Sequence, residues 1–106
     1  MTLPPPIAAY FAAEPGDDGD ALVAPFAADA VVSDESNSHV GHAAIRAWWA
    51  AARASYSPAT EVLGVTEDAG VTTVRGRVSG SFPNSPVELD FRFTLDAGRI
   101  ARLEIG

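Results

Sequence analysis

Residues 26–49 read FAADAVVSDESNSHVGHAAIRAWW, and the rest of the chain is organised around this stretch. A short apolar strand over residues 29–35 ends in the carboxylate pair Asp34 and Glu35. Residues 36–38 are a polar turn signal, residues 39–41 are expected to form a brief return strand, and a helix carrying both tryptophans follows. Because polar groups and aromatic rings gather here, we expect a ligand or a reaction to involve this stretch.

Apolar residues at helical spacing predict helices both before and after this strand. We expect a first helix over residues 3–14, since proline is tolerated in the first turn and Ile7, Tyr10 and Phe11 form an apolar stripe. A second, short helix is expected at residues 19–27, after aspartates that suit a helix N-terminus. The longest helix is predicted at His42–Tyr56, with Arg46 and Arg53 facing water.

After Pro58 the apolar residues alternate with polar ones, which is typical of half-buried strands. Four antiparallel strands in a meander are predicted at residues 60–67, 71–82, 87–96 and 99–105. Helices followed by such a meander indicate an α+β fold, in which a curved antiparallel sheet packs its concave face on the helices. This arrangement can leave a pocket between the sheet and the helices.

The register of the central hairpin follows if a tight turn is centred between Asn84 and Ser85. Val78 then faces Phe91, Gly76 faces Phe93, and Arg77 faces Arg92 on the polar side. Gly80 opposite Leu89, together with Gly76, is expected to leave room for a cavity. In the last hairpin Phe93 faces Leu103, which places Arg92 opposite Glu104.

Composition excludes several classes of function. The 106 residues, expected to form one domain over 1–106, carry a formal charge of −7, which argues against nucleic acid and anionic membranes as partners. Without cysteine there is no disulfide or thiolate metal site, and without lysine there is no Schiff base. No signal peptide and no stretch of about 20 apolar residues is visible, so a cytoplasmic protein is expected. The bias to Arg and Ala suggests a bacterial genome of high GC content.

With these features the chain resembles the nuclear-transport-factor-2-like superfamily, in its SnoaL-like, ketosteroid-isomerase-like branch. The resemblance spans nearly the whole chain. It is carried by Tyr10 and three segments: FAADAVVSDE at 26–35, GHAAIRAW at 41–48 and LDFRFTLDAGRIARLEI at 89–105. It implies a cone-shaped, cystatin-like α+β barrel, commonly a homodimer through the sheet, and a cup that hosts isomerases, dehydratases, polyketide cyclases or non-catalytic modules.

The resemblance also implies roles for two residues. Asp34 aligns with the aspartate that shuttles a proton in ketosteroid isomerases, and Tyr10 aligns with the tyrosine that donates to the enolate oxygen. An apolar cup would raise the pKa of such a carboxylate and improve it as a base. The alternatives are a core aromatic for Tyr10 and a turn cap or solvated group for Asp34. The family's second acid is missing, because Leu89 takes its inward position and Asp90 faces out, and Trp49 replaces a supporting tyrosine.

Other residues complete the expected site. His39 is either a general acid or base or a solvated turn residue, and His42 is a helix-start residue. The two histidines do not make a metal site, since no third ligand is indicated. No phosphate-binding glycine motif and no cofactor are expected. Trp49 is the better candidate for the pocket wall and Trp48 the second, and further apolar ligand contacts are expected from Phe11, Phe26, Val78, Leu89 and Phe91.

Two functions remain open from the sequence. The first is a domain that binds a hydrophobic small molecule and carries out cofactor-free isomerisation, cyclisation or dehydration, with Asp34 as the base and Tyr10 and His39 as polar partners. The second is a non-catalytic dimeric domain that binds a ligand or a protein. The spacing of Tyr10 and Asp34 favours the first, whereas the missing second acid favours the other.

Overall fold

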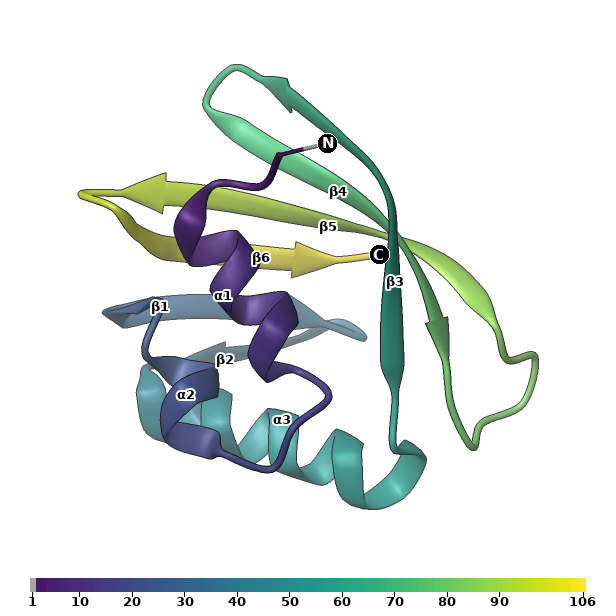
Figure 1. Cartoon of the computed structure of the whole chain (residues 1–106). Coiled ribbons are helices and arrows are strands. Elements are labelled where there is room, and N and C mark those ends of the chain that lie inside the picture. Colours follow the sequence, from purple (N-terminus) through teal and green to yellow (C-terminus); the bar gives the residue numbers. More distant parts are fainter. Residues whose placement is uncertain (1) are drawn as a thin grey trace.

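A six-stranded sheet and three helices make up this computed structural model, which describes residues 2–106. The helices are α1 (Pro5–Ala13), α2 (Gly19–Val23) and α3 (His42–Tyr56). The strands are β1 (Phe26–Asp34), β2 (Asn37–Val40), β3 (Ala59–Asp68), β4 (Val71–Ser79), β5 (Val87–Asp96) and β6 (Arg99–Ile105). Figure 1 shows the sheet curving around α1, with α3 at one end and β3 running down to the end of α3. The predicted α+β class with a curved sheet is confirmed.

The sheet order is β2-β1-β6-β5-β4-β3. The meander from β3 to β6 is antiparallel as predicted, but β1 lies parallel to β6, so the sheet is mixed. This pairing also corrects two boundaries: Phe26 pairs with Ile100, and Ile100 N–H donates to the carbonyl of Pro25 over 2.8 Å. Strand β1 therefore begins at Phe26 rather than residue 29, and α2 ends at Val23 rather than residue 27.

The core lies between the concave face of the sheet and α1. Tyr10 from α1 makes edge-to-face contacts with Phe26 of β1 at 5.9 Å and with Phe93 of β5 at 5.6 Å between ring centroids. These three rings are almost fully buried. Such burial, at roughly 25 cal/mol per Å² of apolar surface, is the main stabilising contribution that fixes α1 on the sheet. Among residues 2–106, no helix is both long and apolar enough to cross a membrane.

The turn between β1 and β2 determines where Asp34 lies. Asp34 pairs with Asn37, and the two residues between them, Glu35 and Ser36, have φ of 51° and 65°. Two positive φ values are typical of the tight hairpin turns that match strand twist. The turn therefore precedes the predicted position at 36–38, and β2 starts at Asn37. Because alternate residues of a strand share a face, Asp34 lies on the same core-facing side as the buried Val32.

The predicted register of the central hairpin is wrong by four residues. Val78 pairs with Val87 and Val74 with Phe91, so β4 ends at Ser79 rather than residue 82. Residues 80–86 form a wide loop held by hydrogen bonds: Gly80 N–H donates to Ser85 Oγ, Ser85 N–H donates to the carbonyl of Phe82, and Ser81 N–H donates to the carbonyl of Tyr56. An even-numbered shift keeps every side chain on its predicted face, so alternation alone could not reveal it.

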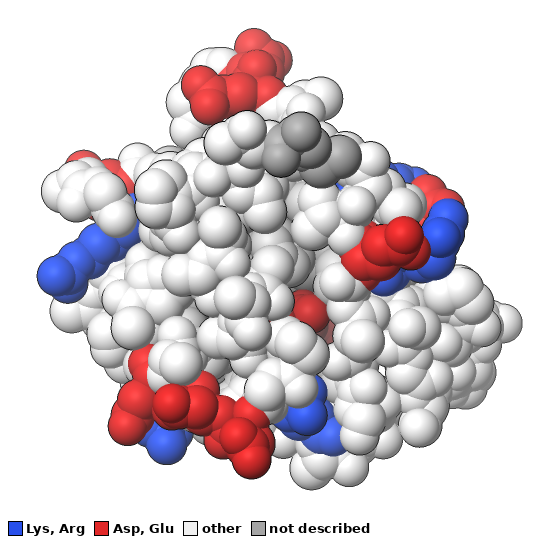
Figure 2. All heavy atoms as spheres, viewed as in Figure 1, with Lys and Arg blue, Asp and Glu red and all other residues white. Residues whose placement is uncertain are grey.

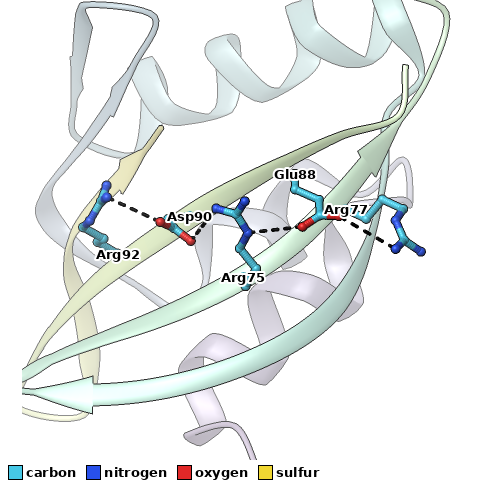
Figure 3. A network of polar contacts seen from close by, with 5 residues as sticks. All are labelled: Arg75, Arg77, Glu88, Asp90 and Arg92. Atoms are coloured by element: carbon cyan, nitrogen blue, oxygen red, sulfur yellow. Dashed lines mark hydrogen bonds and ion pairs between the residues drawn. The ribbon is translucent and has the colours of Figure 1, made fainter. Parts of the chain in front are cut away.

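The outer face of the sheet carries a ladder of alternating charges (Figure 3). Its members, from β4 and β5, are Arg92, Asp90, Arg75, Glu88 and Arg77. In the actual register Arg77 lies opposite Glu88 and Arg75 opposite Asp90, so the predicted repulsion between Arg77 and Arg92 does not occur. Arg92 does face Glu104, and Phe93 faces Leu103, as predicted.

Gly76 of β4 and Gly80 of the following loop permit close packing and do not leave empty space, which corrects the expectation for both. A Cβ at Gly76 would lie 2.8 Å from Thr60 Cγ2 and 2.9 Å from Phe91 Cε1. A Cβ at Gly80 would lie 2.6 Å from the carbonyl oxygen of Tyr56. The room for a ligand therefore lies elsewhere on the concave face.

Gly76→Ala is expected to lower the free energy of unfolding by about 1–3 kcal/mol, because the new methyl group overpacks the space between Thr60 and Phe91. Gly64→Ala, on β3, is the matched control, since a Cβ there has no neighbour within 4 Å. That change should be neutral or stabilise by up to about 1 kcal/mol. Urea unfolding of both variants measures the difference, and equal stabilities would contradict the packing role of Gly76.

Candidate functional site

A cavity of about 840 Å³ lies between the sheet and the helices α1 and α3. It brings together all three predicted polar residues, Tyr10, Asp34 and His39. Five of the predicted apolar contacts also line it: Trp48, Trp49, Val78, Leu89 and Phe91. Two do not. Phe26 is fully buried and packs edge-to-face on Tyr10, and the partly buried Phe11 packs edge-to-face on Phe91 and Phe93, so their expected ligand contacts are corrected to core contacts.

Asp34 is held at the cavity by an indole. Trp48 Nε1–H donates to Asp34 Oδ2 over 3.0 Å, and the ring of Trp48 lies 6.0 Å from the ring of His39. The carboxylate sits on the last residue of β1, before the tight turn, and the indole comes from the second turn of α3. The structure thus orients the carboxylate towards the cavity through a partner on another element.

Tyr10 lies on α1 and is 1% exposed. Burial raises the pKa of Tyr10 well above its usual 10.0, and the negative charges of Glu14 and Asp34 raise the pKa further. The phenol therefore stays neutral at physiological pH and keeps a proton to donate. The hydroxyl of Tyr10 therefore interacts electrostatically with the carboxyl groups of both Glu14 and Asp34.

Glu14 is a site residue that sequence reasoning missed. It directly follows α1, lines the cavity and is only 7% exposed. Burial raises its pKa from the ordinary value of 4.5, while Thr60 and the guanidinium of Arg53 partly offset this. A signal was present: Glu14 lies four residues after Tyr10 and therefore on the same helical face.

The main chain of Glu14 is fixed by α3. Its carbonyl oxygen accepts from Trp49 Nε1–H over 3.0 Å and from Arg53 Nη1–H over 3.3 Å. The guanidinium of Arg53 also lies over the ring of Trp49, 5.7 Å from its centroid. The prediction that Arg53 faces water is therefore corrected: its guanidinium joins α3 to the end of α1.

The strands β3 to β6 contribute no acid to the described lining of the cavity, so Asp34 of β1 is the acid that the sheet places there. Leu89 of β5 points into it, whereas Asp90 forms an ion pair with Arg75 at 3.1 Å on the outer face. Trp49 occupies the wall where the resemblance suggested a tyrosine. The inward position of Leu89 and the outward position of Asp90 agree with the sequence interpretation, even though the register that led to them was four residues off.

The histidines differ in their surroundings. His39 lines the cavity, whereas His42 Nε2 lies 2.9 Å from the carbonyl oxygen of Phe26, which the helix-start position of His42 explains. Within residues 2–106 no group of three or more His, Asp or Glu side chains is arranged to hold a metal ion.

The cavity has an uneven charge. Among the described residues that line it, three are carboxyl side chains, Glu14, Asp34 and Glu35, and none is Arg. Figure 2 shows a largely uncharged face with a hollow in which acidic atoms are visible. Without a cation to pair with, an anionic ligand would be repelled in this low-dielectric space.

Glu14→Gln is expected to change how stability depends on pH. A carboxyl whose pKa is raised on folding stabilises the protein fully below its unfolded pKa of about 4.5, and this stability is lost as pH rises through the folded pKa. Wild type should therefore lose melting temperature above that point relative to Glu14→Gln. Scanning calorimetry between pH 4 and pH 8 measures this, with Glu35→Gln, an exposed residue of the same cavity, as control. Parallel curves for wild type and Glu14→Gln would contradict the raised pKa.

The model of the SnoaL-like domain family matches residues 7–103 of the chain. Among solved structures, the chain is similar to a candidate polyketide cyclase from Sinorhizobium meliloti, with 49% identity and a TM-score of 0.94. That match covers 98% of this chain and 95% of the other. No curated protein matches the sequence.

More distant structures share the fold. A protein with a ketosteroid isomerase-like fold from Catenulispora acidiphila, solved in complex with trimethylamine, is 20% identical over 99% of this chain and 86% of its own, with a TM-score of 0.85. A cystatin-fold protein from Novosphingobium aromaticivorans is 18% identical over 100% of this chain and 98% of its own, with a TM-score of 0.82. These matches agree with the cystatin-like architecture of the sheet and helices.

Proposed function

The chain belongs to the SnoaL-like domain family, and from this premise we propose that it binds a neutral, largely apolar small molecule and catalyses a cofactor-free proton transfer on it. One observation carries the proposal: Asp34 and Tyr10, which come from different elements, line the same cavity. A carboxylate and a neutral phenol around one bound molecule supply a base and a hydrogen-bond donor.

The wall of the cavity supports the proposed class of substrate. Trp48, Trp49 and Phe91 offer aromatic surface, and Val78 and Leu89 offer aliphatic surface. The carboxyl groups disfavour an anion, as argued above. A molecule with a carbonyl group in an apolar skeleton fits this lining, and the similarity to a candidate polyketide cyclase supports the same class, since polyketides are rich in ketones.

The chemistry needs few groups. In the proposed step the carboxylate of Asp34 removes a proton from a carbon next to the carbonyl, and the C–H electron pair moves towards the carbonyl oxygen. The O–H of Tyr10 donates to that oxygen while charge develops. Asp34 then returns the proton to another carbon, which gives isomerisation. Alternatively, the carbanion attacks a second carbonyl carbon, and the alkoxide that forms as the C=O π bond breaks takes the proton back from Asp34, which gives cyclisation. We assign to His39, which lines the cavity with its ring 6.0 Å from that of Trp48, the role of a further polar partner in the proton transfer.

A non-catalytic binding domain is the second candidate, and the inward position of Leu89 favours it, because β5 supplies no acid to assist Tyr10. The two functions separate experimentally. Fluorescence of Trp48 and Trp49 reports binding of a neutral aromatic ketone, and proton abstraction from 5-nitrobenzisoxazole, compared between wild type and Asp34→Asn, reports chemistry. Binding without any abstraction above the buffer rate would leave the non-catalytic function alone.

We also propose a homodimer through the sheet, as the resemblance to this superfamily implies. The charge ladder from Arg92 to Arg77 is the exposed surface available for it, since its alternating charges can pair with a second copy. Sedimentation velocity tests this point, and a species of 11.0 kDa at all concentrations would exclude it.

A further inference from the structure

We propose that Glu14 is a second functional acid of the cavity, whose carboxylic O–H donates a hydrogen bond to the carbonyl oxygen of the bound molecule alongside Tyr10. This inference rests on the proposed function, because it assigns a further residue to the same site. It also names the feature of the ligand that the site recognises, an uncharged oxygen acceptor.

Placement is the first argument. Glu14 lies one helical turn beyond Tyr10, so the two side chains leave α1 on the same side, and both line the cavity. Hydrogen bonds hold the main chain at Glu14 in place. Trp49 and Arg53 both donate to its carbonyl oxygen, and its own N–H donates to the carbonyl of Tyr10 over 2.9 Å. The carboxyl is therefore presented to a ligand from a rigid support.

Burial is the second argument. Glu14 is 93% removed from solvent yet belongs to the cavity lining, which is unusual for a carboxyl without a functional or structural partner. On its protein side the carboxyl has a structural partner, because the side chain and the backbone N–H of Thr60 lie within hydrogen-bonding reach of it. The other side of the carboxyl lines the cavity and is the side available to a ligand.

The surroundings decide the protonation state. The groups that face Glu14 are Arg53 from α3, Thr60 from β3 and Tyr10 from α1, and Asp34 acts on Tyr10 as well. Burial outweighs the attraction of Arg53, so the pKa of Glu14 is raised and the acid keeps its proton to a higher pH than a solvated glutamate. A neutral carboxylic acid can donate, whereas a carboxylate cannot.

The assignment also explains how the cavity functions without an acid on β5. When Asp34 takes the proton from the C–H bond, the electron pair moves to the carbonyl oxygen, which two O–H donors then stabilise. The O–H bonds of Tyr10 and Glu14 stay intact, and the same proton returns from Asp34 to carbon. The helix thus supplies the donor that Leu89 cannot.

The test uses 2-acetonaphthone, a neutral ketone that does not titrate, bound to the full chain and followed by tryptophan fluorescence from pH 4 to pH 9. In wild type we expect the affinity to fall about five- to tenfold as pH rises, because one hydrogen bond to the ketone is lost when Glu14 ionises. In Glu14→Gln the affinity should be independent of pH, and in Glu35→Gln the fall should persist. A flat profile in wild type, or the same fall in Glu14→Gln, would overturn the proposal.

A second measurement needs no substitution and so does not depend on how a variant folds. In protein labelled with ¹³C at the glutamate carboxyls, saturating 2-acetonaphthone should shift the ionisation of Glu14 to higher pH, because a ligand that binds the protonated form must stabilise that form. An unchanged or lowered pKa of Glu14 would contradict donation to the ketone. A purely structural role would give no shift.

The outcome is separable from that of the proposed function. Equal proton abstraction by wild type and Asp34→Asn would remove Asp34 as base, yet leave the pH-dependent ketone binding in place. Conversely, pH-independent binding would remove Glu14 as donor, even if Asp34→Asn is inactive.

Discussion

Asp34→Asn should lower the rate of proton abstraction from 5-nitrobenzisoxazole by about 10²- to 10⁴-fold, the range that a positioned general base contributes. The amide cannot accept a proton from carbon, but it keeps the size of the carboxylate and an oxygen that can accept from Trp48 Nε1–H. The fold and the binding of the molecule should therefore be retained. Steady-state absorbance measurements of kcat and KM give the result, and the loss should fall on kcat.

The matched control is Asp29→Asn, the same change on the same strand at an exposed position. Asp29 lies five positions before Asp34 and is not part of the cavity lining. Its activity should equal that of wild type. If Asp34→Asn abstracts the proton as fast as Asp29→Asn, then Asp34 is not the base and the non-catalytic function becomes the better description.

Phe26→Ala should give the largest loss of stability, about 3–5 kcal/mol in the free energy of unfolding. Phe26 is fully buried, and it packs on Tyr10 at the first residue of β1. Removing the ring leaves a cavity between α1 and the sheet that the surrounding side chains cannot fill. For a domain of this length each 1 kcal/mol corresponds to about 4–8 °C in melting temperature.

Phe82→Ala provides the comparison, since this ring is half-buried, lines the cavity and contacts Tyr56 edge-to-face at 5.8 Å. It should cost less stability, about 1–2 kcal/mol, but weaken the binding of an aromatic ketone. Urea unfolding and fluorescence titration of both variants check the pattern. A stable Phe26→Ala protein that binds the ketone more weakly would contradict the core role and indicate that Phe26 contacts the ligand.

The elements of the fold followed closely from local patterns. Helix α3 has the predicted bounds, His42–Tyr56, because a glycine precedes its apolar stripe and Ser57 and Pro58 end it. The strands β5 and β6 also have the predicted bounds, since alternation and the glycine of their turn are strong local signals. The parallel contact of β1 with β6 did not follow, because no local signal marks which distant strand becomes a neighbour.

The central hairpin shows why a correct face does not imply a correct register. Alternation placed Leu89 inward and Asp90 outward, and both lie there. It could not distinguish pairings that differ by four residues, because each keeps the same faces. The loop 80–86 decided between them through contacts of Gly80 and Ser81 that reach Ser85 and the end of α3.

By itself the sequence determined the class of fold, because helical and strand periodicity specify which side chains face inward. Its resemblance to the family, and not its periodicity, implied a shared site for Tyr10 and Asp34, and both line one cavity. Only the tertiary structure decided that Phe26 is core, that Trp48 holds Asp34, and that Glu14 is a buried acid. Burial of a carboxyl depends on what other elements place over it. For Glu14 these are α3 and β3, which meet α1 only when the sheet curves around it.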